Sequence, residues 1–514
     1  MHVDATLLSS TYCRRHHLIH ANVTANVEIA RLCLIANNLQ YNQIYFLSYS
    51  HLSNIIIELV AVYLQHQKEI NMLLDFSVSN FKSFADTADF SMLAAPKQTG
   101  LDYSLASFRE GSRKVRSICS SVIYGPNASG KSNIISAMDV LRAIVLRGNI
   151  RNAEEHASPN PASVSLELIP NKSLSTAKPV SFSIDFYEKE MRFHYKLSID
   201  LGKFLKESHK RKILSEELYV NNEMVFSRGD TLVLGNFKKI VPYIMPGVSE
   251  EDEGTLSIAR NGLNPEELFL TNGFKLIYAP ALAGIILDWM TNKFMVICRA
   301  DSMQLIRRFS DVKKQSVYVE KTVNEAAKLF GINSNAVGYV VNDDDKEAKL
   351  CSIFNDQSGK RSVAIPADIF ESYGTIRFIN LFPIVIRAIR TGGTLVVDEF
   401  DASIHPKALM SIISVFHNDD INLHHAQLIF NTHNPIFLNS NLFRRDEIKF
   451  VERDDDTHNS ILYSLSDFGT AGENGVRKNE DYMTNYFVSR YGAIKDIDFS
   501  PIFEEIMNSD KKET

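Results

Sequence analysis

The chain has 514 residues, of which 45% are hydrophobic and 23% are charged, and its formal net charge is −6 at pH 7. These proportions are close to those of globular proteins and exclude a disordered or fibrous chain. Since single cores stop growing at about 250–300 residues, we expect two or three lobes. The negative charge argues against a general attraction to nucleic acid and leaves open a local basic face that contacts DNA.

The five cysteines are scattered without a C-x-x-C pair, which predicts neither a disulfide framework nor a zinc site. A reducing cytoplasm is therefore the expected location. The apolar stretches are interrupted by charge well short of the roughly 18 residues that span a bilayer, so we expect no membrane partner.

The first 71 residues differ in composition from the rest of the chain. They contain six of the 15 histidines and neither glycine nor proline. His16, His17 and His20 lack carboxylate or cysteine partners at metal-ligand spacing. Alternating apolar residues around Asn80 then predict a pair of strands. Because this pattern starts at Met72, residues 1–71 are interpreted as an N-terminal extension, with upstream sequence translated from a mis-assigned start as one explanation.

The segment "YGPNASGKSN" follows an apolar strand pattern and leads into a helical one. It matches G-x-x-x-x-G-K-[ST], the P-loop pattern, at Gly125, Gly130, Lys131 and Ser132. In such a loop, backbone N–H groups and the helix N-terminus bind phosphate oxygens. We expect Lys131 to reach the β- and γ-phosphates and Ser132 to hold Mg²⁺. The alternative is an ordinary strand-to-helix turn.

The middle of the chain predicts hairpins and short helices. Alternation on both sides of "EKE" predicts one hairpin, and Asn221 and Asn222 suit the turn of a second. Helices are expected in "NPEELFL" with Pro265 in the first turn, around Trp289, and in "TVNEAAKLFGI". Two further strands flank the acidic turn "NDDDKEAK".

The segment "GGTLVVDEFDASIHP" predicts the second part of a phosphate site. Its strand, Thr394 to Val397, ends in two adjacent carboxylates. Because neighbouring strand residues point to opposite faces, we assign Asp398 to the magnesium side and Glu399 to the general base that polarises water. A second strand, "AQLIFNTH", places His433 at the same sheet edge, either as a reactive residue or as a structural histidine.

Four motifs in this order resemble those of ABC-type ATPases. "GPNASGKSN", "ESYGTIRFINL", "LVVDEFDASIHP" and "LIFNTHN" look like the Walker A, signature, Walker B with D-loop, and switch-histidine motifs. Within that class they are most similar to the RecF/OLD-like AAA-domain ATPases common in bacterial phage-defence and abortive-infection operons. The resemblance covers roughly residues 72–500.

The resemblance implies an α/β fold, a P-loop ABC-type ATPase head without a long coiled coil. Residues 72–145 would form its first half and residues 366–514 its second half, with an inserted α+β lobe at 146–365. It also implies ATP and Mg²⁺ as cofactors. The implied nucleotide-binding residues of the P-loop are Gly125, Pro126, Asn127, Ala128, Ser129, Gly130, Lys131, Ser132 and Asn133.

In this class ATP lies between two protomers, so the resemblance implies a homodimer or a higher oligomer. Ser372 and Gly374 would contact the γ-phosphate held by the other protomer's P-loop, and Asp401 and Ser403 would lie in the loop between protomers. Tyr373 departs from the usual L-S-G-G-Q signature, which favours slow turnover. The alternative for "ESYGT" is an ordinary helix N-cap.

The leading hypothesis is an ATPase whose dimer closes on ATP and switches an effector protein encoded in the same operon. One alternative is a slow or non-hydrolysing ATP-gated scaffold that sequesters a toxin. Another is an OLD-like nuclease, but only about 80 residues follow His433 and they contain no toprim-like or H-N-H set. The defence setting follows from family analogy alone.

Overall fold

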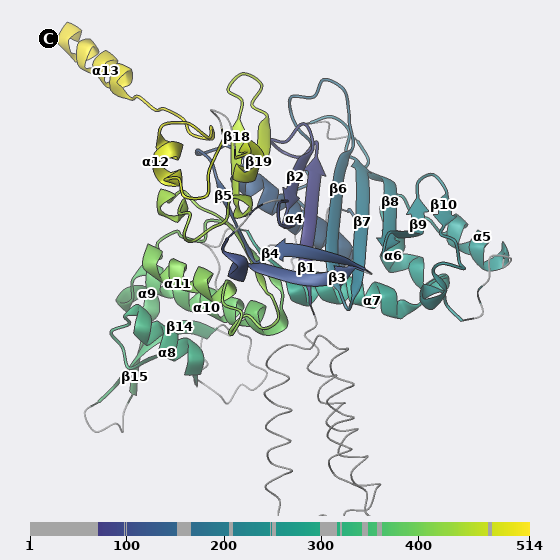
Figure 1. Ribbon diagram of the computed structural model, residues 1–514. Helices are drawn as coiled ribbons and strands as arrows, with labels where there is room; N and C mark the ends of the chain where they lie inside the picture. Colours follow the sequence, from purple (N-terminus) through teal and green to yellow (C-terminus); the bar gives the residue numbers. More distant parts are fainter. Residues whose placement is uncertain are drawn as a thin grey trace, which may run out of the picture. The chain divides into compact units, whose positions relative to one another are not determined.

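The computed structural model describes residues 70–513, apart from 97, 99, 111, 152–165, 205–208, 247, 249–252, 299–315, 319–320, 342–347, 357–361 and 471–474 (Figure 1). The chain divides into two units, residues 1–68 and 69–514, of which only the second is described. The extension predicted over residues 1–71 lies outside the described residues except for Ile70 and Asn71, and so do the N-terminal histidines.

A six-stranded sheet forms the centre of the nucleotide-binding half, in the order β11-β16-β17-β5-β18-β19. Its first five strands are parallel, and β19 runs antiparallel to β18. The expected strand Thr394–Val397 is confirmed with the same limits. The strands are β5 (Ser120–Tyr124), β11 (Phe294–Ile297), β16 (Thr394–Val397), β17 (Gln427–Asn431), β18 (Ile448–Arg453) and β19 (Ser460–Ser464).

Both faces of this sheet are buried, because the side chains of each strand alternate between two hydrophobic cores. Ile123 and Val396 join helix α4 (Lys131–Arg147) in one core. Val122 and Val397 join α10 (Tyr373–Thr391) and α11 (Pro406–Phe416) in the other. A parallel sheet covered by helices on both faces is the α/β arrangement expected from the continuous apolar strands.

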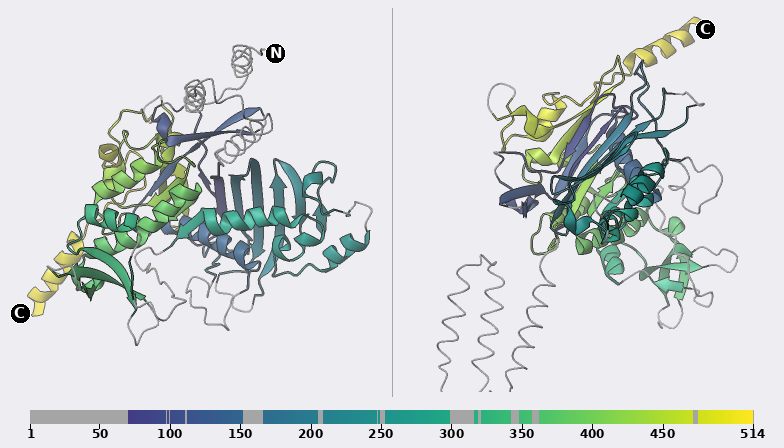
Figure 2. Two further views of the ribbon diagram at one scale, coloured as in Figure 1. Left: turned by 90° about the horizontal axis from the view of Figure 1, so that it is seen from below. Right: turned by 90° about the vertical axis from the view of Figure 1, so that its right-hand side faces the viewer.

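A second, seven-stranded antiparallel sheet has the order β10-β9-β8-β7-β6-β1-β2 (Figures 1 and 2). Its inner face shares the core of α4, which therefore packs between the two sheets. The expected hairpin turn at Asn221 and Asn222 is confirmed, with φ of 51° and 67°. The strands are β1 (Met72–Ser79), β2 (Ala88–Ser91), β6 (Val180–Glu188), β7 (Met191–Asp200), β8 (Lys212–Val220), β9 (Glu223–Arg228) and β10 (Leu232–Leu234).

The segment expected as an inserted lobe, residues 146–365, contributes to both large sheets. β6 pairs with β1 along seven registered positions, and β11 pairs with β16. The physical reason is that the edge of the β6–β7 hairpin presents unpaired backbone N–H and C=O groups, and β1 supplies a free edge that pairs with them. Separately, a four-stranded sheet formed by β12 (Ser316–Tyr318), β13 (Ala336–Val341), β14 (Ala348–Asn355) and β15 (Ser362–Pro366) packs with α8 (Lys321–Phe330) against α10.

The remaining described elements connect and cover these sheets. The helix expected with Pro265 in its first turn begins instead at Phe269, because the Asn264 side chain accepts a hydrogen bond from Glu266 N and holds a turn there. The other elements are β3 (Leu105–Glu110), β4 (Arg113–Ile118), α5 (Glu253–Asn261), α6 (Phe269–Asn272), α7 (Pro280–Asp288), α9 (Ala367–Phe370), α12 (Tyr482–Phe487) and α13 (Ser500–Glu513).

No helix in the described part of the chain is long and apolar enough to cross a membrane. None of the described helices exceeds the 19 residues of α10, so the described residues contain no long coiled coil.

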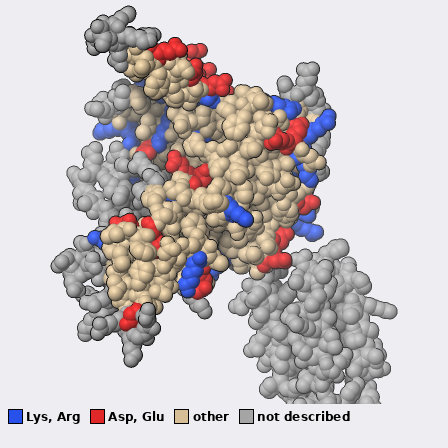
Figure 3. Space-filling view, turned by 90° about the vertical axis from the view of Figure 1, so that its left-hand side faces the viewer, with Lys and Arg blue, Asp and Glu red and all other residues tan. Residues whose placement is uncertain are grey.

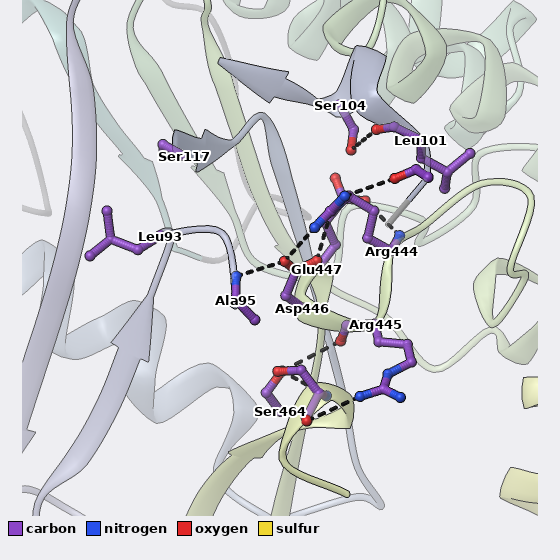
Figure 4. A network of polar contacts seen from close by, with 12 residues as sticks. Leu93, Ala95, Leu101, Ser104, Ser117, Arg444, Arg445, Asp446, Glu447 and Ser464 are labelled. Carbon is purple, nitrogen blue, oxygen red and sulfur yellow. Dashed lines mark hydrogen bonds and ion pairs between the residues drawn. The ribbon is translucent and has the colours of Figure 1, made fainter. Parts of the chain in front are cut away.

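A buried polar network holds β18 beside β5, the strand that leads into the P-loop (Figure 4). The guanidinium of Arg444 donates to both carboxylate oxygens of Asp446 at 2.9 Å, and Ala95 N donates to Asp446 at 2.8 Å. Glu447 accepts from Arg444 N at 2.7 Å and from Ser120 Oγ of β5 at 2.8 Å. Because Arg444 and Asp446 are paired and Glu447 is hydrogen-bonded, the turn before β18 is fixed to the sheet.

Candidate nucleotide-binding site

The P-loop runs from the end of β5 to the first turn of α4. Ala128 and Gly130 have φ of 62° and 109°, so the loop curls through left-handed conformations. A Cβ atom on Gly125 would lie 2.2 Å from the backbone oxygen of Val451. One on Gly130 would lie 2.6 Å from Ser83 Oγ. The loop therefore requires glycine at both positions, and it ends at the N-terminus of α4, where the N-cap Gly130 makes no side-chain cap hydrogen bond.

Lys131 is the first residue of α4 and is largely buried against the loop. Its Nζ donates to the backbone oxygens of Gly125 at 2.7 Å and Pro126 at 2.9 Å. Burial lowers its pKa to about 8, and the nearby carboxylates of Asp398, Glu399 and Asp401 only partly offset this effect. The Lys131 ammonium group, which is bound here by two carbonyl oxygens, can exchange them for phosphate oxygens, whose negative charge compensates its own better.

Ser132 and Asp398 are brought together from the two sequence motifs. Ser132 Oγ donates to Asp398 Oδ1 at 2.9 Å, and Asn431 Nδ2 donates to the same oxygen at 2.5 Å. A hydroxyl and a carboxylate oxygen are ligand types that Mg²⁺ prefers. The donor set beside the P-loop therefore fits a magnesium ion.

Glu399 follows Asp398 in a strained conformation with φ of 50°. Its backbone N donates to Asn431 Oδ1 at the end of β17, and its backbone oxygen accepts from the guanidinium of Arg377 on α10. Non-glycine residues occupy this region at a cost, so the surrounding contacts must hold it there. Asn431 and Arg377 thus fix the backbone of Glu399 from two elements.

Asn431 and Arg377 were not selected from the sequence. Asn431 was detectable in principle, because it ends the strand that leads to His433. Arg377 could not be detected, since the sequence of a largely apolar helix does not show which loop one of its arginines contacts.

His433 lies close enough to the P-loop for the charge of Lys131 to act on its imidazole. Burial lowers the pKa of its imidazole, and the charge of Lys131 lowers it further. The imidazole is therefore neutral at pH 7 and able to donate one hydrogen bond and accept another. The preceding residue, Thr432, donates to Asp401 Oδ2 at 2.6 Å, which ties this strand end to the loop after Glu399.

Ser372 and Gly374 lie at the N-terminus of α10. Ser372 is the N-cap, and its Oγ accepts from Thr375 N at 3.1 Å, as the helix-cap interpretation requires. A Cβ on Gly374 would lie 2.1 Å from the backbone oxygen of Ser403. The signature segment therefore packs directly on the loop that follows Glu399 in the same chain.

A P-loop between β5 and α4, with two carboxylates at the end of β16, a parallel strand separated from β5 by β17, is the arrangement of a P-loop nucleotide-binding site. The sequence matches a family model described as "AAA domain, putative AbiEii toxin, Type IV TA system" over residues 120–226 and 304–439. Over these residues the chain is similar to an AAA domain, a class of domains that binds ATP.

Among the curated proteins, no sequence matches this chain. Among solved structures, the "SMC head domain from Thermotoga maritima" is similar at 13% sequence identity and a TM-score of 0.30, and the match covers 76% of this chain and 98% of that chain.

Proposed function

We propose that the protein binds and hydrolyses ATP, and that two copies close on two ATP molecules to switch a partner effector protein. The observation that carries the proposal is the convergence of the P-loop lysine and serine with Asp398 and Glu399 at one sheet edge.

The chain's own residues supply phosphate binding. Lys131 and the N-terminus of α4 provide positive charge and N–H donors for the β- and γ-phosphates. Ser132 and Asp398 would hold a magnesium ion, which would neutralise charge at the phosphates. Asn431 keeps the Asp398 carboxylate in place by donating to it.

Hydrolysis is assigned to Glu399 and His433. Glu399 is the general base that orients and polarises the attacking water, and its backbone position is fixed by Asn431 and Arg377. His433 offers its neutral imidazole as a hydrogen-bond donor to the γ-phosphate. The tight packing of Gly374 on Ser403 couples the signature helix to the same loop.

The surface beside Ser372 supports closure by a second copy. Ile369 and Tyr373 flank Ser372 and are 74% and 53% exposed. Exposed apolar side chains next to a polar helix N-terminus are typical of an interface. In the closed dimer, Ser372 and Gly374 would contact the γ-phosphate held by the other copy's P-loop.

The biological setting is proposed from the family description, which names a putative AbiEii toxin of a type IV toxin–antitoxin system. We infer from it a role in bacterial phage defence, carried out in the cytoplasm. A shared γ-phosphate gives the closed state a higher affinity for ATP than the open state, which is what a switch requires.

The test is the steady-state ATPase rate of the wild-type protein and of Glu399→Gln, with ATP affinity measured on both. We expect Glu399→Gln to bind ATP with unchanged affinity and to hydrolyse it at least about 100-fold more slowly. ATP binding without any Glu399-dependent turnover would replace the proposal with a non-hydrolysing, ATP-gated scaffold.

A further inference from the structure

Helix α13 carries an apolar stripe that the described fold leaves exposed. Phe499, directly before the helix, and Ile502, Phe503 and Met507 within it are 60%, 55%, 64% and 59% exposed. Their spacing of i, i+3, i+4 and i+8 places them on one helix face, and Ile506 occupies the i+7 position. Figures 1 and 2 show α13 extending away from the sheets. Contiguous exposed apolar surface of this kind marks an interaction site.

A short extended segment connects α13 to the folded body. Ala493 is fully buried, and the chain runs without regular structure from Ile494 to Phe499 before the helix begins. Six extended residues reach about 20 Å. The Asp498 carboxylate accepts from Ser500 N at 2.8 Å and so organises the first turn. The segment therefore has the form of a tethered helix.

The helix needs a covering surface to be stable. A 14-residue helix is marginal in water on its own, because nucleation is costly and packing supplies most helical stability. The stripe spans only Phe499–Met507, much less than the three or four heptads of a self-standing coiled coil. Pairing with the same helix of a second copy is therefore unfavourable.

The charge of α13 and of the segment before it indicates which kind of partner surface can bind the helix. From residue 496 to the end of α13 at Glu513, six charged side chains are acidic and only two, Lys511 and Lys512, are basic. In the space-filling view, acidic side chains lie beside uncharged surface at the top, where α13 is (Figure 3). Helices that lie on membranes carry basic residues instead, and anionic lipid would repel this one. Charge complementarity requires basic residues on the partner.

We propose that α13 is a docking helix that inserts Ile502 and Phe503 into an apolar groove, rimmed by Lys or Arg, on a partner protein. Anchors at i, i+3, i+4 and i+7 are the pattern of helix-in-groove recognition. The inference rests on the proposed control of a partner protein, and it assigns that contact to a surface separate from the nucleotide site.

The test places a photo-crosslinking amino acid at position 503 of the full chain in its native host, with position 233 as the control. Val233 is also apolar and 52% exposed, but it lies on β10. We expect a specific adduct from position 503 only. The adduct partner, identified by mass and purified, should bind the wild-type chain about 100-fold more tightly than Ile502→Asp/Phe503→Asp. Glu504→Lys/Glu505→Lys should weaken binding and reduce its salt dependence.

Four results would overturn the inference: no adduct, an adduct to a second copy of the chain, an adduct to lipid, or a purified partner that binds Ile502→Asp/Phe503→Asp as tightly as wild type. The ATPase rate of this double variant should equal that of wild type. A loss of docking with normal ATP turnover thus separates this inference from the proposed ATPase function, which is tested independently by Glu399→Gln.

Discussion

At the scale of single residues, the site depends on how the backbone of Glu399 is held. Its positive φ is maintained by Asn431 on one side and Arg377 on the other. Arg377 is 5% exposed, and its Nε and Nη1 are buried and have no hydrogen-bond partner among the described residues. Such a group costs stability. We interpret Arg377 as a positioning residue, which holds the backbone of Glu399 in place.

Arg377→Met should therefore lower kcat about tenfold while changing ATP affinity little, because the methionine fills the volume but cannot hold Glu399. Thermal stability should stay equal or rise, since a buried and incompletely paired charge is removed. The matched control is Arg390→Met at an exposed position of the same helix. An unchanged kcat in Arg377→Met would remove the positioning role.

A second residue-scale prediction concerns Asp75 on β1. Burial raises its pKa to about 6, and a hydrogen bond from Ser91 offsets only part of this effect. Since the folded pKa lies above the ordinary value of 3.8, ionisation of Asp75 destabilises the fold as pH rises from 3.8 through 6. The destabilisation is complete above that window and absent below it.

Asp75→Asn should accordingly raise the free energy of unfolding by about 1 kcal/mol at pH 8, and this gain should shrink between pH 6 and pH 4.5. Urea unfolding at pH 8, 6 and 4.5 measures it. Asp89→Asn, at an exposed position of β2, is the control and should show no such trend. A gain that grew toward low pH would contradict the assignment.

At the scale of elements, the position of the P-loop strand depends on the buried network before β18. Asp446→Ala would leave Arg444 buried without its carboxylate partner. We expect a loss of about 3–5 kcal/mol in the free energy of unfolding. Removing the exposed partner of Lys495 by Asp455→Ala should cost less than about 1 kcal/mol. Equal effects of the two substitutions in chemical denaturation would show that the network does not stabilise the sheet.

The elements that local patterns define could be predicted from sequence. The strand Thr394–Val397 and the turn at Asn221 and Asn222 depend on apolar runs and on residues that tolerate positive φ. The pairing of β6 with β1 could not be predicted, because neither strand's pattern specifies a partner about 100 positions away. The prediction of a helix start near Pro265 was wrong, because a side-chain turn at Asn264 competes with the helix.

In the candidate site, too, local patterns could be predicted from sequence and long-range contacts could not. The P-loop, Asp398 and Glu399 follow from motif and strand context, because glycine, lysine and paired carboxylates at those spacings have few other uses. Arg377 could not be found this way, since its contact with Glu399 joins two elements whose packing is set by the whole core.

At the scale of the whole molecule, we predict that each chain carries two halves of a nucleotide site and that neither half is complete alone. Lys131 lies in one, and Ser372 caps the helix of the other. In a two-fold symmetric closed dimer, each ATP would meet the P-loop of one copy and the signature segment of its twin. ATP should therefore drive association.

Association can be measured on Glu399→Gln, which should retain ATP. We expect light scattering to give a dimer mass with ATP and a monomer mass without it. Ile369→Glu should keep ATP binding but prevent the dimer, because it puts a charge into the proposed interface. Leu329→Glu, which alters a residue 91% exposed on α8, is the matched control. A dimer mass without ATP, or one that Ile369→Glu leaves intact, would contradict nucleotide-driven closure.

The most direct test mixes two inactive variants, Lys131→Ala and Ser372→Glu, in equal amounts and measures the ATPase rate. If the site is shared, each mixed dimer contains one intact site, and the mixture should recover about a quarter of the wild-type rate. If the mixture remains as inactive as either variant alone, although both bind each other, ATP is not held between two copies and the central claim is wrong.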